Sequence, residues 1–212
     1  MPSEFDYDTI CAKYGDGIPC PDDFSFPSSV VDKWAQTQPD QLAFHWVSHD
    51  FGTERKVTYA ELSDLSNRAA RAFLDSGLVK GDRVLIQLPR VLDFWTAIFG
   101  LMRIGAVPVP GTSLLVGKDL EFRATAAQAQ AFVGDAESCG RFGQVARKVG
   151  VSRIFQVRTD GDGALGEGRI DFQAAVERVA QGTKCDVEHS KTDLAIVFFT
   201  SGTTGAPKMV LL

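Results

Sequence analysis

The sequence predicts an α/β protein whose sheet is mostly parallel and flanked by helices. From Gly81 onward, short apolar segments alternate with longer helical segments. Helices between successive strands favour parallel pairing, because a crossover between parallel strands needs about a dozen residues or more. The candidate strands are also apolar at consecutive positions, which is typical of a sheet that is covered on both faces.

The composition is that of an ordinary globular protein and excludes few functions. The 212 residues suffice for one sizeable domain or two small ones, and 44% of them are hydrophobic. A net charge of −5 argues against non-specific binding to nucleic acid or to anionic membranes. We therefore expect no nucleic-acid partner.

Targeting signals and cysteine clusters are not evident in the sequence. No apolar run reaches the length of a membrane span, and the acidic opening residues 1–8 resemble neither a secretory nor a mitochondrial presequence. The four cysteines form no C-x-x-C pair, so we expect reduced thiols and a cytoplasmic location. They are Cys11, Cys20, Cys139 and Cys185.

The first elements along the chain are short. Residues 1–26 predict an irregular arm, and Pro-Ser-Ser at 27–29 predicts the capped start of a short helix that ends before Pro39. A strand is expected over 42–47. His45 and His49 lie at its end, but strand residues four apart do not converge on a metal, so a surface pair is expected.

A capping box marks the start of the next helix. In Thr58-Tyr59-Ala60-Glu61, the hydroxyl and the carboxylate can each accept a hydrogen bond from a free backbone N–H group. Apolar residues then recur at helical spacing until Gly77, which predicts the end of the helix. The expected apolar stripe is Leu62, Leu65, Ala69, Phe73 and Leu74.

The remaining chain predicts the alternating strands and helices on which the fold class rests. The expected strands are 83–88, 107–110, 131–134, 154–157 and 194–199, and the last of them is expected to be buried. The expected helices are 91–104, 119–130, 141–149 and 171–179.

A glycine-rich segment at 161–166 matches the dinucleotide-binding pattern G-x-G-x-x-G. A true fingerprint runs directly into a helix that holds the pyrophosphate, whereas Glu167-Gly168-Arg169 delays any helix here. Asp160 and Asp162 also begin a calcium-loop pattern, which Ala164 does not continue. A surface loop is the preferred interpretation of this segment.

The segment Thr-Ser-Gly-Thr-Thr-Gly-Ala-Pro-Lys, directly after the expected strand 194–199, predicts a phosphate-binding loop. Its glycines allow the backbone to approach a ligand closely, its N–H groups and hydroxyls are donors, and its lysine supplies a positive charge. The spacing is not that of the Walker motif, and the alternative is an ordinary surface loop. The candidate binding residues are Thr200, Ser201, Gly202, Thr203, Thr204, Gly205, Ala206, Pro207 and Lys208.

This loop resembles the phosphate-binding loop of the adenylate-forming (ANL) enzymes, which comprise acyl-CoA synthetases, peptide-synthetase adenylation domains and luciferases. Residues 57–62 are similar to the Thr-Tyr-x-Glu-Leu segment of that family, and residues 80–106 are similar to its first strand–helix unit. Pro-Gly-Thr at 110–112 and Met209 are similar to the medium-chain acyl-CoA synthetase branch. The resemblance covers residues 25–212.

The resemblance implies a reaction in which a carboxylic acid and Mg-ATP form an acyl-adenylate and pyrophosphate, and the acyl group then passes to coenzyme A. Residues 200–208 would bind the phosphates of ATP, with Mg²⁺ assisting. The loop after Pro110 would approach coenzyme A, although Ser113-Leu114 stand where the family has a glutamine. By family analogy, the mitochondrial matrix is an alternative location.

The resemblance also implies a division of the chain and an incomplete set of motifs. Residues 27–80 would be an incomplete part of a second α/β subdomain, with many of the partners of its helix outside this sequence, and 81–212 would be an α/β subdomain that ends in the phosphate-binding loop. The acyl pocket, the adenine-binding segment and the catalytic C-terminal lysine lie outside this sequence, so no catalytic residue is expected in it. The alternatives are an adenylation domain that loads a carrier protein and a non-catalytic nucleotide-binding or interaction module.

Overall fold

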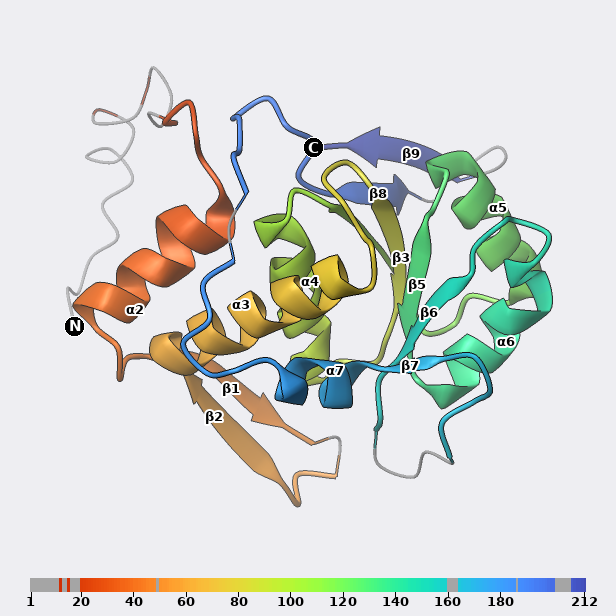
Figure 1. Cartoon of the computed structure of the whole chain (residues 1–212), viewed down its shortest axis with the longest axis horizontal. Coiled ribbons are helices and arrows are strands. Elements are labelled where there is room, and N and C mark those ends of the chain that lie inside the picture. Colours follow the sequence, from red (N-terminus) through yellow and green to blue (C-terminus); the bar gives the residue numbers. More distant parts are fainter. Residues whose placement is uncertain are drawn as a thin grey trace.

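The computed structural model describes residues 12, 15, 20–48, 50–159, 164–185, 187–200 and 207–212. Its centre is a five-stranded parallel sheet with the strand order β4-β3-β5-β6-β7 (Figure 1). The α/β prediction is confirmed. The strands are β3 (Arg83–Gln87), β4 (Val107–Gly111), β5 (Ala131–Gly134), β6 (Arg153–Gln156) and β7 (Ile170–Asp171).

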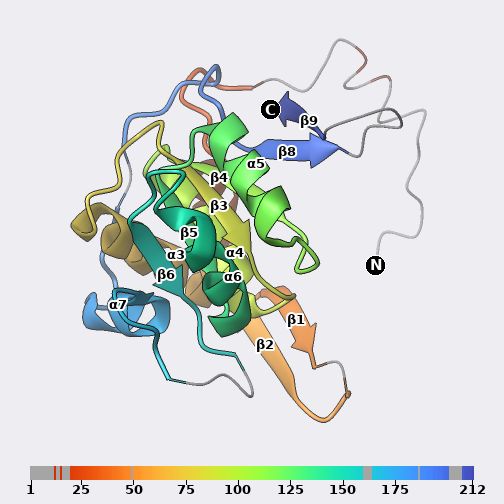
Figure 2. The same cartoon turned by 90° about the vertical axis from the view of Figure 1, so that its right-hand side faces the viewer.

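Helices cover both faces of this sheet, as the apolar character of its strands requires (Figure 2). One face carries α3 (Tyr59–Asp75), α4 (Leu92–Arg103) and α7 (Phe172–Arg178), and the other carries α5 (Gly117–Ala127) and α6 (Ala136–Ala146). The chain passes from β3 through α4 to β4, and then returns through α5 to β5 on the other side of β3. Ligands of open α/β sheets bind at the carboxyl ends of the strands beside such a reversal.

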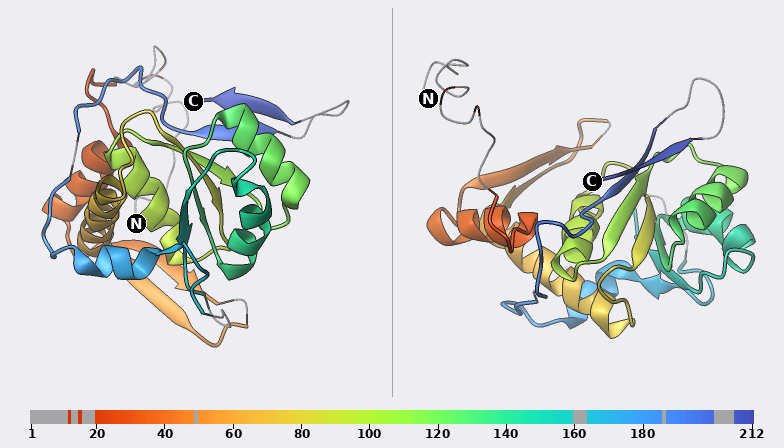
Figure 3. Two further views of the ribbon diagram at one scale, coloured as in Figure 1. Left: turned by 45° about the vertical axis from the view of Figure 1, so that its right-hand side comes forward. Right: turned by 90° about the horizontal axis from the view of Figure 1, so that it is seen from above.

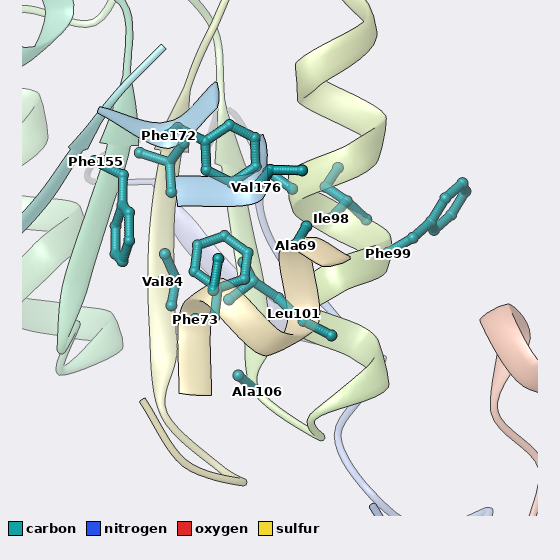
Figure 4. Close-up of a cluster of buried hydrophobic side chains, with 14 of the residues drawn as sticks. Ala69, Phe73, Val84, Ile98, Phe99, Leu101, Ala106, Phe155, Phe172 and Val176 are labelled. Atoms are coloured by element: carbon teal, nitrogen blue, oxygen red, sulfur yellow. The ribbon is translucent and has the colours of Figure 1, made fainter. Parts of the chain in front are cut away.

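The larger core lies between the sheet and the helices α3, α4 and α7 (Figure 4). The fully buried ring of Phe73 meets Phe155 edge to face at 5.0 Å between centroids and lies 5.5 Å from Phe172. A Cβ atom on Gly100 of α4 would lie 2.7 Å from the Cβ atom of Ala69, so the two helices pack backbone to backbone there. Many partners of the stripe of α3 were expected outside this sequence, but α4, α7 and the sheet already bury Leu62, Ala69 and Phe73.

Of the interactions predicted for the ends of α3, the Thr58 cap and the glycine ending form, but the reciprocal bond of Glu61 does not appear among the described residues. The hydroxyl of Thr58 accepts a hydrogen bond from the N–H of Glu61 at 3.2 Å, while the Glu61 carboxylate accepts from Arg55 at 2.6 Å. At the other end, Gly77 has a φ of +87°, and Leu78 N–H donates to the Phe73 carbonyl at 3.1 Å. That bond is typical of a Schellman ending, which requires a left-handed residue such as glycine.

The first elements form an outer layer against α3. The predicted short helix is η1 (Pro27–Asp32), a π-helix, followed directly by α2 (Lys33–Thr37). The residue at its N-cap position, Phe26, makes no side-chain hydrogen bond, so the predicted serine cap is wrong. Pro27 occupies the first turn, where its missing N–H costs nothing. The hairpin β1 (Leu42–Val47) and β2 (Glu54–Thr58) follows. His45 contacts Glu54 at 2.7 Å across it, and His49 lies outside the described residues.

A buried ion pair connects η1 to α4. The Arg103 side chain is fully buried, and its guanidinium donates to the two oxygens of Asp32 at 2.9 and 2.6 Å and to the hydroxyl of Ser66 at 3.0 Å. Ser63 donates a further hydrogen bond to Asp32 at 2.5 Å. Burial raises the pKa of Asp32, but the hydrogen bonds from Arg103 and Ser63 and the charge of Arg103 outweigh it and hold that pKa below 3.8. This network couples elements that the sheet does not connect.

One of the next two predicted segments differs in the structure, and the other agrees with its interpretation. Helix α6 begins at Ala136 rather than at 141, because Asp135 caps it by accepting a hydrogen bond from Ser138 N–H at 2.7 Å. After the glycine-rich segment comes the strand β7 and not directly a helix, in agreement with the surface-loop interpretation. Residues 160–163 of that segment lie outside the described residues.

Three further expectations can be compared with the described part of the chain. No helix there is long and apolar enough to cross a membrane. No group of three or more metal-ligating side chains is present among those residues. Cys20 is exposed and Cys139 and Cys185 are buried, whereas Cys11 lies outside the described ranges.

Candidate functional site

The candidate site lies at one end of a two-stranded antiparallel hairpin, β8 (Val197–Thr200) and β9 (Lys208–Leu211), where Thr200 pairs with Lys208 (Figure 3). Strand β8 ends at Thr200 and strand β9 begins at Lys208, and these two residues are direct partners in the register. The Thr200 hydroxyl donates to the backbone carbonyl of Lys208 at 3.5 Å. Because directly opposed residues of a ladder share a face, these two side chains lie on the same side of the hairpin.

The predicted buried strand before the loop is wrong in two respects. It begins at Val197 rather than at Leu194, and only Val197 is fully buried, whereas Phe198 is 41% exposed. The reason is that β8 pairs with β9 and does not join the five-stranded sheet, so one of its faces is not covered within these residues. An apolar run of this length does not distinguish the two cases.

The structure places three of the nine candidate residues. Thr200 and Lys208 are exposed, and Pro207 is half-buried beside them. Ser201, Gly202, Thr203, Thr204, Gly205 and Ala206 lie outside the described residues. The described part of the site therefore offers one ammonium group and one hydroxyl, which are groups that suit phosphate oxygens.

The hairpin is fixed to the α/β core through β8. Val197 belongs to the smaller core, which lies under α5 and α6, and β8 runs beside β4. The ring of Phe199 contacts Phe122 of α5 at 6.1 Å between centroids, and the guanidinium of Arg123 lies 4.8 Å from its centroid. The position of the hairpin is thus fixed by the packing of β8 against β4 and α5.

A second loop of interest follows β4, where the resemblance implies an approach of coenzyme A. The side chain of Gln87, a fully buried residue at the carboxyl end of β3, forms hydrogen bonds with the backbone of this loop. The Gln87 Nε2 donates to the carbonyls of Thr112, Ser113 and Leu115 at 3.0, 3.2 and 3.0 Å. Leu114, which lies between Ser113 and Leu115, is 85% exposed, so its side chain is accessible to a ligand in solution.

The sequence interpretation missed Gln87. The signal that could have revealed it is a polar residue at the end of an otherwise apolar strand, since a fully buried amide needs partners. Arg141, on the other side of the same loop, donates to the Ser113 carbonyl at 3.0 Å. The loop after β4 is thus held by side chains from β3 and α6.

Comparison with known families matches residues 31–212 to the family described as "AMP-binding enzyme". The chain belongs to this family. Among curated proteins, this AMP-binding chain is 36% identical over 198 residues to "Acyl-coenzyme A synthetase ACSM5, mitochondrial" of Mus musculus, with 91% of the chain and 33% of the relative covered. It is 33% identical over 195 residues to ACSM1 of Homo sapiens, also named a mitochondrial acyl-coenzyme A synthetase, with 89% of the chain and 33% of the relative covered.

Solved structures agree with these relatives. The AMP-binding chain superposes on an acyl-CoA synthetase from Brucella canis with a TM-score of 0.78 and 29% identity, over 99% of this chain and 36% of that one. The resemblance to acyl-CoA synthetases drawn from the sequence motifs is confirmed. The chain spans about a third of the length of the curated relatives it matches.

Proposed function

We propose that this chain is the N-terminal portion of an ATP-dependent acyl-CoA synthetase and that its hairpin end binds the phosphates of ATP. The observation that supports this best is the direct pairing of Thr200 with Lys208 at the end of a strand packed on α5. The pairing brings together the two ends of the segment whose composition predicts a phosphate site. The likeness to acyl-CoA synthetases supplies the reaction.

In this proposal, residues 200–208 bind the β- and γ-phosphates during formation of the acyl-adenylate. Hydroxyl and ammonium donors aimed at a phosphate chain stabilise the charge that develops on the transferring group. Mg²⁺ would enter as the cation of the nucleotide, since this ion is usually held by few carboxylates together with substrate phosphates. Coenzyme A would approach the loop after β4, where Gln87 holds the backbone.

We further propose that residues 27–80 belong to a second subdomain and 81–212 to the α/β subdomain, with α3 as the contact between them. The cytoplasm is the proposed location. The alternative is the mitochondrial matrix, in line with the names of the relatives. Fractionation of cells that express the protein with an epitope tag decides between the two locations.

The first test of the proposed function is the replacement of Lys208 by alanine. We expect the affinity for ATP to fall roughly tenfold, because a charge-assisted hydrogen bond contributes about 1.5–3 kcal/mol and part of that is screened at an exposed site. The measurement is isothermal titration of the 212-residue chain with ATP. Lys56→Ala, at a comparably exposed lysine of β2, is the matched control and should leave the affinity unchanged. Equal affinities of the wild-type chain and Lys208→Ala would contradict the assignment.

The second test concerns turnover. We expect the 212 residues alone to show no acid-dependent exchange of pyrophosphate into ATP. Holding the carboxylate in line with the α-phosphorus can supply about 7–11 kcal/mol of the barrier, and the resemblance places the residues that would hold it outside this sequence. The assay uses a panel of fatty and aromatic acids with radiolabelled pyrophosphate. Exchange above the acid-free background would refute this expectation while leaving the phosphate site intact.

A further inference from the structure

Strand β9 has one edge that no described strand pairs with. It pairs with β8 along its other edge, and these two strands form a separate two-stranded sheet. Figures 1 and 2 show β9 on the outside of β8, away from the five-stranded sheet. A free edge of this kind presents backbone donors and acceptors that a further strand can bind. The edge runs along the whole strand, whereas the proposed phosphate site lies at the end where Thr200 pairs with Lys208.

The register of the hairpin determines which backbone groups point to the free edge. Leu212 N–H donates to the Ile196 carbonyl at 3.1 Å, and Ile196 N–H donates to the Leu212 carbonyl at 3.2 Å. Hydrogen-bonded and non-hydrogen-bonded pairs alternate along an antiparallel ladder, so the N–H and C=O groups of Val210 also face β8. Those of Met209 and Leu211 face outward, and they form no hydrogen bond with any other described segment. The free edge thus offers two donors and two acceptors.

The side chains along this edge are apolar. Lys208, at the first position of β9, is the only charged residue of the strand, and the next four residues are Met209-Val210-Leu211-Leu212. All four are exposed. Natural edge strands are commonly protected by charged side chains or prolines, and residues 209–212 contain neither. Because a two-stranded sheet is only marginally stable by itself, a further strand on this edge would stabilise the hairpin.

The edge is complementary to a second copy of itself. When two β9 strands run antiparallel with Val210 opposite Val210, Met209 of each copy lies opposite Leu211 of the other. The outward N–H and C=O groups of both copies are then all paired. Lys208 lies opposite Leu212 of the second copy, so like charges do not meet. Parallel pairing would instead place the two Lys208 side chains beside each other, which is destabilising.

We propose that the 212-residue chain forms a symmetric dimer through the free edges of β9, centred on Val210. The two hairpins then make one continuous four-stranded sheet in the order β8-β9-β9-β8. Antiparallel pairing of identical strands gives two-fold symmetry, which is the commonest symmetry of homo-oligomers. The contact is smaller than that of a stable dimer, so the association is reversible and depends on concentration. This surface lies outside the function proposed above and does not depend on it.

The test measures the mass of the 212-residue chain by sedimentation equilibrium, from the low to the high micromolar range and at several ionic strengths. The wild-type chain should shift reversibly from 23.0 kDa toward twice this mass. Val210→Lys and Val210→Glu each place two like charges opposite each other at the centre of the pairing. Each should raise the dissociation constant at least about tenfold. An equimolar mixture of the two variants should dimerise again, and more weakly at high salt.

Two further variants separate pairing of the edges from other contacts. Leu211→Pro removes an outward N–H group and none of the hydrogen bonds to β8, so it should weaken the dimer while the hairpin persists. Phe198→Lys is the matched control, because Phe198 lies opposite Val210 on the same exposed face but one strand away from the edge. It should leave the dissociation constant within about twofold of the wild type, since the added charges are far apart and screened. Far-UV circular dichroism and thermal unfolding establish that each variant is folded.

Three results would overturn the inference. A wild-type chain that stays at 23.0 kDa over the whole concentration range does not pair through this edge. A dimer that Phe198→Lys weakens as much as Val210→Lys arises from contact between the exposed faces of the hairpins, and a dimer that no variant weakens lies at another surface. Should Leu211→Pro not fold, the mixture of the two charged Val210 variants decides, and its failure to dimerise where the wild type does overturns the inference.

Discussion

Replacing Arg103 with methionine is expected to lower the free energy of unfolding by about 3–5 kcal/mol. The guanidinium is fully buried and forms two hydrogen bonds with Asp32. Its removal leaves a largely buried carboxylate without its cation, which costs far more than the loss of an exposed ion pair. The measurement is urea-induced unfolding at neutral pH, followed by circular dichroism.

Two further variants test the origin of this effect. Arg71→Met removes an exposed ion pair with Asp75 and should change the free energy of unfolding by less than about 1 kcal/mol. The double variant Arg103→Met, Asp32→Leu should be more stable than Arg103→Met alone, because the uncompensated charge is gone. A double variant less stable than the single one would show that packing, rather than the unpaired charge, accounts for the loss.

The ion pair of Arg103 and Asp32 also predicts how the free energy of unfolding depends on pH. Since the folded-state pKa of Asp32 lies below its ordinary value of 3.8, its carboxylate contributes stability that is complete above the ordinary pKa. That contribution is lost as the pH falls through the folded-state pKa. In Arg103→Met the lowering causes are mostly removed, so this share of the acid sensitivity should disappear from unfolding curves recorded between neutral pH and pH values near 3.

Replacing Phe73 with alanine is expected to cost about 3–5 kcal/mol of unfolding free energy. The ring is fully buried between α4, α7 and the sheet, and it contacts both Phe155 and Phe172. Truncation removes both aromatic contacts and leaves a cavity that these rigid neighbours cannot fill. Chemical unfolding measures the loss, and Val79→Ala, at a side chain that is 57% exposed, is the control.

A loss below about 1 kcal/mol for Phe73→Ala would contradict the position of α3 in the core. It would instead favour the original expectation that the stripe of this helix has its partners outside the 212 residues.

The sheet and its helices could be predicted from the sequence because each rule involved is local. The bounds of β5 and β1 were predicted at 131–134 and 42–47, and the structure has both. The prediction fails where the pairing or burial of a segment depends on a residue that is distant in the sequence. The apolar run before Thr200 predicts a strand, but its pairing with β9 and its exposed face depend on contacts that no local pattern records.

The candidate site shows the same distinction. Composition alone predicts a phosphate loop at residues 200–208, since few other functions need that combination of glycines, hydroxyls and lysine. Neither Gln87 nor Arg123 could be identified in this way, because each acts on a segment far from it in sequence. Gln87 holds a loop about 25 residues later, and Arg123 lies against Phe199, with three strands and two helices between them in the chain.

The contact of Phe73 with Phe172 has a consequence for how the chain is made. Helix α3 is complete early in synthesis, whereas the ring that closes its core follows about a hundred residues later. At translation rates of roughly 5–20 residues per second, the part of α3 that α7 covers stays open for about 5–20 seconds after it leaves the ribosome. During that interval it is a surface on which chaperones can act, and a newly made chain acquires its native core only when α7 has emerged.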